Sequence, residues 1–267
     1  MSRGWFIALA TASVLMAEAG STLAHDYYVN PDRFVVAVGQ SVPVRLFVGT
    51  PGTIKEHPYR SKATVWFYAH GPGRRWVIAG KNYYRPAGSF RGSKPGVHTL
   101  VFRSNHSYIE LPPAKFETYL RHEGLRSIVA ERKRRGESER PGRESYARHC
   151  KALVQVGGKS DGFDRRVGLP FELTALDDPF AAKAGTRVRF ALTLDGKPHA
   201  GALVELMSLG DMEVAAAATS SSKGIVALKI PKAGRWVVAT THMRRAPAGV
   251  KGDWESLWAT LTFELAR

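Results

Sequence analysis

SVPVRLFVG, residues 41–49, decides the fold class of this chain. Every second residue from Val42 to Val48 is apolar, which is the period of a β-strand that buries one face. Similar short apolar segments, separated by turn signals such as HGPG (70–73), fill residues 25–110. This pattern is typical of antiparallel β-sandwiches. We therefore predict a mainly β protein whose first domain, residues 25–165, is a β-sandwich.

The period of the apolar residues changes between residues 113 and 151. PPAKFETYLRHEGL begins with two prolines and places Phe116, Tyr119 and Leu120 on one face of a helix. A second segment, RESYARHCKAL, is also interpreted as helical before the strand-like ALVQVG begins. We predict a helical insertion over about residues 113–151, packed on the first sandwich.

A second domain is predicted over residues 166–267. The extended, proline-marked LPFELTALDDPF (169–180) is the expected crossover into it. Short β segments with hairpin turns such as DGKP (195–198) follow to the end of the chain. This spacing indicates an immunoglobulin-like or transthyretin-like sandwich, so the whole chain is expected to hold two tandem sandwiches.

The first 24 residues have the pattern of a secretory signal peptide. Arg3 precedes the apolar run WFIALATASVLMA (5–17), which at thirteen residues is too short to span a bilayer. Cleavage could follow Ala19 or Ala24, and we prefer Ala24 because a polar spacer separates it from the apolar run. We expect a periplasmic protein that begins at His25.

The chain is strongly basic, with 39 Lys and Arg against 23 Asp and Glu and a net charge of +16. Behind a signal peptide, and without a recognition motif, this charge does not predict nucleic acid as a partner. The expected alternatives are a plain solvated surface, which we favour, and attraction to an anionic envelope surface. The single cysteine, Cys150, cannot form an intramolecular disulfide.

His25 is the most informative of the nine histidines. Cleavage after Ala24 would give one residue both a free α-amine and an imidazole, which together can chelate a metal ion. Such nitrogen-rich ligands suit copper(II) or nickel(II) better than magnesium or calcium, while zinc and iron stay open. None of the histidines forms a His-Glu-x-x-His or similar zinc motif.

The last hairpin supplies the predicted partners of His25. His242 ends the segment GRWVVATTH, and Asp253 and Glu255 begin the last strand on its apolar face. Carboxylates at that position need a cation. A metal would serve, and so would a basic residue of the same loop: Arg244, Arg245 or Lys251.

Several motifs together resemble a bacterial periplasmic family, the domain of unknown function family 4198, whose members are often labelled nickel-uptake or NikM-like. They include AHDY at the end of the leader, VGQSVPVRLFVG, PGVHTLVFRS, FETYLRHEGL, ESYARHCKALVQVG, PFELTALDDP, DGKPHAGALVEL, PKAGRWVVATTH and DWESLWATLTFEL. The resemblance implies a secreted tandem β protein associated with transition-metal uptake or handling. It implies no established reaction.

The sequence is consistent with three functions. The leading hypothesis is a periplasmic protein that captures a transition metal through His25, His242, Asp253 and Glu255 and passes it to membrane uptake components. A metal-free structural or adhesive protein of the envelope is the alternative. A copper-dependent oxidase, with Trp254 and Trp258 as an aromatic binding face, is the third. We expect binding rather than catalysis.

Overall fold

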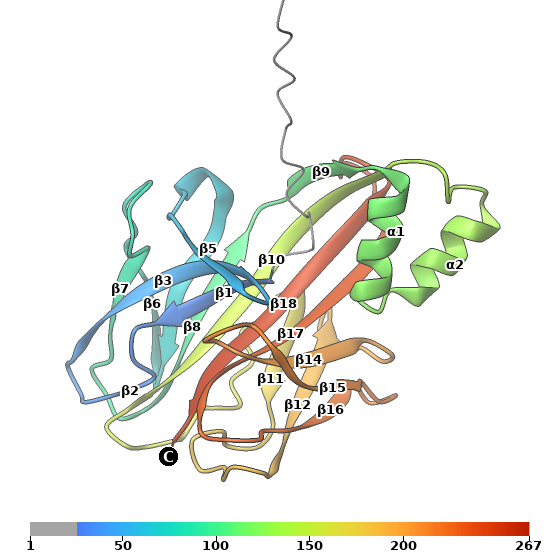
Figure 1. Ribbon diagram of the computed structural model, residues 1–267. Coiled ribbons are helices and arrows are strands. Elements are labelled where there is room, and N and C mark those ends of the chain that lie inside the picture. Colours follow the sequence, from blue (N-terminus) through green and yellow to red (C-terminus); the bar gives the residue numbers. More distant parts are fainter. Residues whose placement is uncertain (1–25, 267) are drawn as a thin grey trace, which may run out of the picture.

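The computed structural model describes residues 26–266, and three sheets dominate it (Figure 1). The predicted signal peptide and His25 lie outside the described residues. The mainly β class is confirmed. Sheet A is small and contains β1 (Asp26–Pro31), β3 (Ser41–Thr50), β4 (Thr53–His57) and β7 (Gly88–Arg91).

Sheet B has ten strands and runs through the whole molecule. Its order is β15 (Val214–Thr219), β14 (Leu203–Ser208), β17 (Gly234–Arg245), β18 (Trp254–Leu265), β10 (Gly142–Val156), β8 (Gly96–Ser104), β5 (Thr64–Gly71) and β6 (Arg74–Val77). Two short strands also pair with β10: β2 (Val35–Val36) and β9 (Ser107–Leu111). Sheet C contains β11 (Phe171–Ala175), β12 (Arg187–Leu194), β13 (Lys197–Pro198) and β16 (Ile225–Lys229).

Sheets A and C lie on opposite faces of sheet B, as the two faces of β18 show. The odd-numbered residues from 257 to 265 pack in one core with sheet C. On the other face, the hydroxyls of Thr260 and Thr262 donate hydrogen bonds to the carbonyl oxygens of Tyr27 and Val29 in β1. Each small sheet therefore forms a sandwich with a different part of one shared sheet. The prediction of two tandem sandwiches is not confirmed.

The parallel pairing of β10 with β18 joins the two halves of the chain. Residues 144–152 of β10 pair with residues 254–262 of β18, and the two strands run side by side across the middle of Figure 1. The strands of sheet B thus come from both sides of residue 165, where we placed a domain boundary.

The prediction of a helical insertion through residue 151 is wrong in its second half. The helices are α1 (Pro113–His122) and α2 (Arg126–Arg134), whereas residues 142–151 belong to strand β10. Both faces of β10 are covered, so its buried residues do not alternate. Lys151 is accommodated within it because it has a charge partner: Lys151 Nζ lies 2.7 Å from Glu172 Oε1 on β11.

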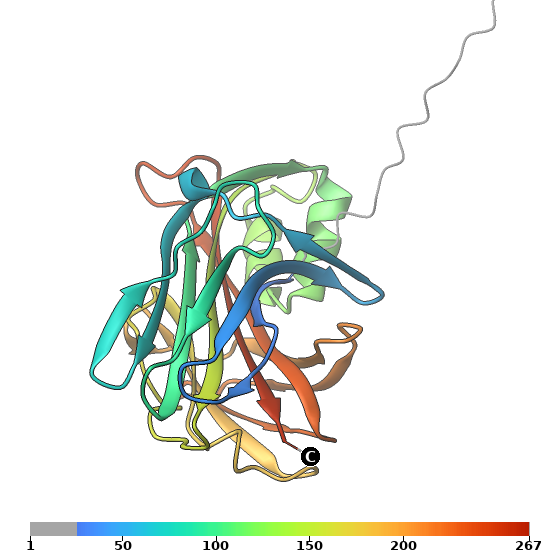
Figure 2. The same ribbon diagram turned by 90° about the vertical axis from the view of Figure 1, so that its left-hand side faces the viewer.

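The helices cover one end of sheet B on the face that carries sheet A (Figure 2). Phe116 and Leu120 of α1 pack with Trp254 and Trp258 of β18. Both tryptophans are buried, so they do not form the exposed aromatic face that an oxidase would need. No helix among residues 26–266 is long and apolar enough to cross a membrane.

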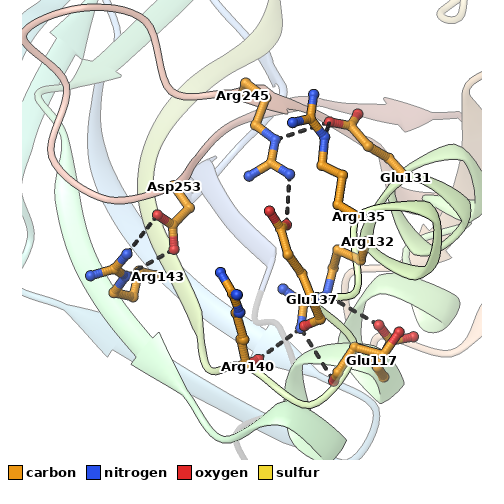
Figure 3. Close-up of polar contacts among 10 residues, drawn as sticks. Glu117, Glu131, Arg132, Arg135, Glu137, Arg140, Arg143, Arg245 and Asp253 are labelled. Atoms are coloured by element: carbon orange, nitrogen blue, oxygen red, sulfur yellow. Dashed lines mark hydrogen bonds and ion pairs between the residues drawn. The ribbon is translucent and has the colours of Figure 1, made fainter.

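Arginine side chains fix α2 and the following loop to the β17–β18 hairpin (Figure 3). Arg245 donates hydrogen bonds to Glu131 (2.9 Å) and Glu137 (2.6 Å), and its guanidinium lies over the ring of Trp254. The buried Arg132 donates to Glu117 and to loop carbonyls. These charges serve a structural role, which accounts for part of the basic excess of this region.

Candidate functional site

Of the predicted site residues, His25 lies outside the described residues, and the other three lie on or beside the β17–β18 hairpin. Asp253 accepts two hydrogen bonds from the guanidinium of Arg143, each 2.8 Å long (Figure 3). This is the bidentate geometry of a strong arginine–carboxylate pair. Both oxygens of Asp253 therefore have a cationic partner.

Glu255 is buried, with 4% of its surface exposed, and both of its carboxylate oxygens are also engaged. Oε2 accepts a hydrogen bond from Arg244 Nε at 2.6 Å, and Oε1 lies 2.8 Å from His106 Nε2. A buried carboxylate needs such partners. Glu255 thus forms an ion pair with Arg244. This is the alternative to a metal that the sequence left open at this hairpin.

His242 lies on the same face of sheet B as Glu255 and packs against a second histidine. Its ring centroid is 4.6 Å from that of His199, and Phe171 of sheet C flanks the pair. Burial, followed by the charges of His199 and Arg244, lowers the pKa of His242 to about 4. The imidazole is therefore neutral near pH 7. The hairpin brings His242 and Glu255 together, whereas Asp253 is directed to Arg143.

A different group of titratable residues surrounds the start of β1. We call Asp26, His122, Glu123 and Glu205 the β1 cluster. Burial raises the pKa of Asp26 well above its usual range, and the negative charges of Glu123 and Glu205 raise it further. The cluster lies on the face of sheet B that carries sheet A and the helices, opposite the face that holds His242.

The end of α1 positions two members of the β1 cluster. Glu123 follows the last helical residue, and Gly124, with φ +69°, turns the chain so that Leu125 N–H donates to Leu120 O at 2.8 Å. Glu123 Oε2 accepts a hydrogen bond from the Thr241 hydroxyl at 2.7 Å. Its Oε1 lies 3.2 Å from His122 Nδ1. The Glu123 carboxylate is therefore fixed against sheet B.

Strand register brings the other two members to the same place. Glu205 of β14 pairs with Ala239 of β17, and Ala239 pairs with Thr260 of β18. Thr260 in turn donates a hydrogen bond of 2.9 Å to the carbonyl oxygen of Tyr27, the residue after Asp26. Asp26 thus lies close to the laterally paired residues Glu205, Ala239 and Thr260 of sheet B.

The β1 cluster has an excess of negative charge. The pKa of His122 is raised, first by its hydrogen bond to Glu123 and then by the carboxylates of Glu123, Glu205 and Asp26. The pKa of Glu205 is raised by burial and by Glu123. Three carboxyl groups and one imidazole thus interact through their charges, and a bound cation would favour the ionised form of the carboxyl groups. The donor set of oxygen and one nitrogen fits a divalent transition metal.

Sequence reasoning missed these residues, although weak signals exist. His122 and Glu123 occur in FETYLRHEGL and Glu205 in DGKPHAGALVEL, two of the motifs that carry the family resemblance. Among residues 26–266, no group of three or more His, Cys, Asp or Glu side chains is placed so that it could hold a metal ion. The cluster would therefore need a further ligand or a small side-chain movement to hold a metal.

The sequence of residues 22–244 matches a family model described as "Domain of unknown function (DUF4198)". The chain belongs to this family. The match confirms the resemblance found in the sequence motifs, and both the β1 cluster and His242 lie inside the matched region of this DUF4198 protein. No curated protein sequence matches the chain.

Solved structures similar to the DUF4198 chain are β proteins of low sequence identity. The D0–D1 domain of intimin is 10% identical, with 91% of this chain and 98% of that chain covered and a TM-score of 0.23. The human OSCAR ligand-binding domain is 11% identical, with 90% and 99% covered and a TM-score of 0.22. A tetra-tandem repeat from the extending region of a large adhesion protein is 10% identical, with 90% and 49% covered and a TM-score of 0.22.

Proposed function

We propose that this protein binds a divalent transition metal outside the cytoplasm, and that the β1 cluster is the binding site. The observation that carries the proposal is the placement of Asp26, Glu123 and Glu205 around the His122 imidazole: burial first and the neighbouring carboxylates second raise the pKa of Asp26, and burial and then Glu123 raise the pKa of Glu205. Burying like charges together is unfavourable unless a cation compensates them. A divalent ion would supply that compensation.

The cluster replaces the β17–β18 hairpin as the proposed partner of His25. Asp253 and Glu255 already have arginine partners, so they have little need of a metal. His25 directly precedes Asp26 in the sequence. After cleavage at Ala24, its α-amine and imidazole would add two nitrogen ligands to those of the cluster and favour copper or nickel over magnesium or calcium. Zinc and iron remain alternatives.

The role that fits such a site is metal capture and transfer rather than catalysis. A site that combines a chelating terminus with a few carboxylates can release its metal when a ligand is protonated or exchanged. We therefore propose membrane uptake components as the recipients and the periplasm, reached through the predicted signal peptide, as the location. The basic surface would allow contact with anionic envelope components.

Isothermal titration with Cu(II), Ni(II) and Zn(II) tests the site. The protein is produced with its leader, and mass spectrometry first establishes whether its amino terminus is His25. We expect Asp26→Asn and Glu123→Gln to weaken metal binding at least ~10-fold, a loss of ~1.4 kcal/mol in binding free energy. Both substitutions are nearly isosteric, and Glu123→Gln keeps an oxygen for the hydrogen bond from Thr241.

His242→Ala and Asp253→Asn are the matched controls. If the β1 cluster holds the metal, both controls bind as the parent does. If His242→Ala weakens metal binding and Asp26→Asn does not, the metal site lies at the β17–β18 hairpin instead. Equal, weak binding by the parent and all four variants would contradict metal binding and favour a structural role in the envelope.

A further inference from the structure

A small cavity lies between β4, the 3-10 turn at Ser61–Ala63 and β10, on the side of β1 that carries Tyr27. Its volume is about 160 Å³. Pockets for drug-sized ligands measure roughly 300–1,000 Å³, so only a small molecule or a single chemical group would fit. The polar residues that line it are His57, Arg60, Thr64, Ser104, Ser107, Tyr146 and Arg148.

Arg148 provides a fixed positive charge in this cavity. Its guanidinium lies over the rings of Tyr27, at 4.6 Å, and Tyr146, at 4.8 Å. The Arg148 backbone N–H donates a hydrogen bond to the Ser104 hydroxyl at 2.9 Å. Within the described part of the chain, no carboxylate pairs with Arg148. Aromatic rings hold a guanidinium in place without neutralising its charge.

A second arginine makes the cavity electropositive. Arg60 lines it and likewise has no ion-pair partner within residues 26–266. Burial lowers the pKa of His57, and the charges of Arg60, Arg148 and Arg85 lower it further. His57 Nδ1 lies 2.9 Å from the carbonyl oxygen of Pro58, which orients the ring. Neither Asp nor Glu occurs among the described residues that line the cavity.

The remaining polar groups are hydroxyls, which can donate hydrogen bonds to an anion. Thr64, Ser104, Ser107 and Tyr146 all line the cavity. The Thr64 hydroxyl already donates to Arg60 O at 2.8 Å and thereby ties the backbone of Arg60 to the start of β5. The other three leave hydroxyl hydrogens that can point inward. Two guanidinium groups with neighbouring hydroxyls are the donors that recognise carboxylate and phosphate oxygens.

We propose that this cavity binds a small oxyanion, with Arg148 and Arg60 as its charge partners and the hydroxyls of Ser107 and Tyr146 as further donors. The shared chemistry is that of a phosphate or a carboxylate group. The cavity uses none of the β1 cluster residues, so this inference does not rest on metal binding. A bound oxyanion would lie on the other side of strand β1 from the β1 cluster.

Isothermal titration of the protein with sodium phosphate and with sodium acetate tests the inference, with sodium chloride at matched ionic strength as the reference. We expect saturable binding of at least one of the two anions beyond the chloride reference. Tighter binding of phosphate identifies a tetrahedral ligand, and tighter binding of acetate identifies a planar carboxylate.

Three variants decide whether the cavity is the site. Arg60→Gln and Arg148→Gln should each weaken binding at least ~10-fold, as expected for loss of a charged donor. Arg33→Gln removes one exposed positive charge elsewhere and should bind as the parent does. Arg60 is exposed, so its variant remains informative if Arg148→Gln fails to fold. Equal affinity in all variants, or no binding beyond the chloride reference, would overturn the proposal.

Discussion

Lys151 on β10 and Glu172 on β11 form a buried ion pair that connects sheet B to sheet C. Lys151 Nζ lies 2.7 Å from Glu172 Oε1, and the two side chains are 1% and 4% exposed. The ammonium also donates to Arg165 O at 3.0 Å and to Thr174 Oγ1 at 3.2 Å. Glu172 accepts hydrogen bonds from the backbone N–H groups of Val167 and Gly168. The pair thus fixes the chain segment that leads into sheet C.

Removing one partner of this pair should be strongly destabilising. Lys151→Met leaves the Glu172 carboxylate buried without its cation, and we expect a loss of ~3–5 kcal/mol in the free energy of unfolding. Adding Glu172→Gln should recover part of this loss, because the amide oxygen can still accept a backbone hydrogen bond. Urea unfolding of the two single variants and the double variant measures the coupling. A loss below ~1 kcal/mol in Lys151→Met would contradict a structural role for the pair.

A comparison of β3 with β10 shows why sequence patterns predicted only part of the fold. In β3, one face is buried and the other is more open, so apolar residues alternate and the strand could be predicted. Strand β10 is covered on both faces, and His149 and Lys151 are buried in it. The charge partner of Lys151 is Glu172 on β11, and such tertiary context does not appear in local periodicity.

The candidate site could also be predicted only in part, because its residues are far apart in the sequence. His25 could be singled out because a signal peptide has recognisable segments. Asp26, Glu123 and Glu205 come from the start of β1, the end of α1 and the middle of β14, and only strand register and the helix end bring them together. At the hairpin, the alternation that predicts a buried Glu255 does not reveal His106, which reaches it from the β8–β9 connection.

Gly124 should be needed for both the turn after α1 and the position of Glu123. Its φ is +69°, and an added Cβ would lie 2.8 Å from Leu203 Cβ. Gly124→Ala should therefore cost ~2–3 kcal/mol, from backbone strain and from the clash together. Gly136 also has a positive φ, +65°, but nothing lies within 4 Å of its Cβ position.

Gly136→Ala is therefore the matched control and should cost only ~1 kcal/mol, the strain term alone. Thermal and urea unfolding measure both variants. Equal losses would show that the contact with Leu203 relaxes without cost.

The buried His149 and the partly buried His242 should make the protein less stable in mild acid. Burial lowers the pKa of His149 to about 3, with smaller effects from Arg103 and His106. An unfolded histidine has a pKa of ~6.5, so the unfolded chain binds more protons below that pH and stability rises with pH across this window. His149 alone should lower the free energy of unfolding by ~2 kcal/mol between pH 7.5 and pH 5.

The variant His149→Gln should show a shallower dependence on pH and keep the part that is due to His242, whose pKa is lowered to about 4. Urea unfolding at pH 5, 6 and 7.5 provides the measurement. An unchanged pH dependence in His149→Gln would show that the imidazole is accessible to protons in the folded state.

The β1 cluster predicts opposite effects of one substitution on stability and on metal response. Asp26→Asn removes a negative charge that Glu123 and Glu205 repel, so the metal-free variant should be more stable than the parent by a few tenths to ~1 kcal/mol. A metal that binds only the folded protein at 100 times its Kd should stabilise the parent by ~2.7 kcal/mol, and the variant by much less. Thermal unfolding with and without the metal, before and after chelator treatment, measures both effects.

Asp253→Asn breaks the pair with Arg143, so this control should lose stability without metal and keep the full metal response. A different result would contradict this: Asp26→Asn is less stable than the parent, yet metal raises its unfolding temperature as much as that of the parent. Asp26 would then be stabilised by partners other than a cation.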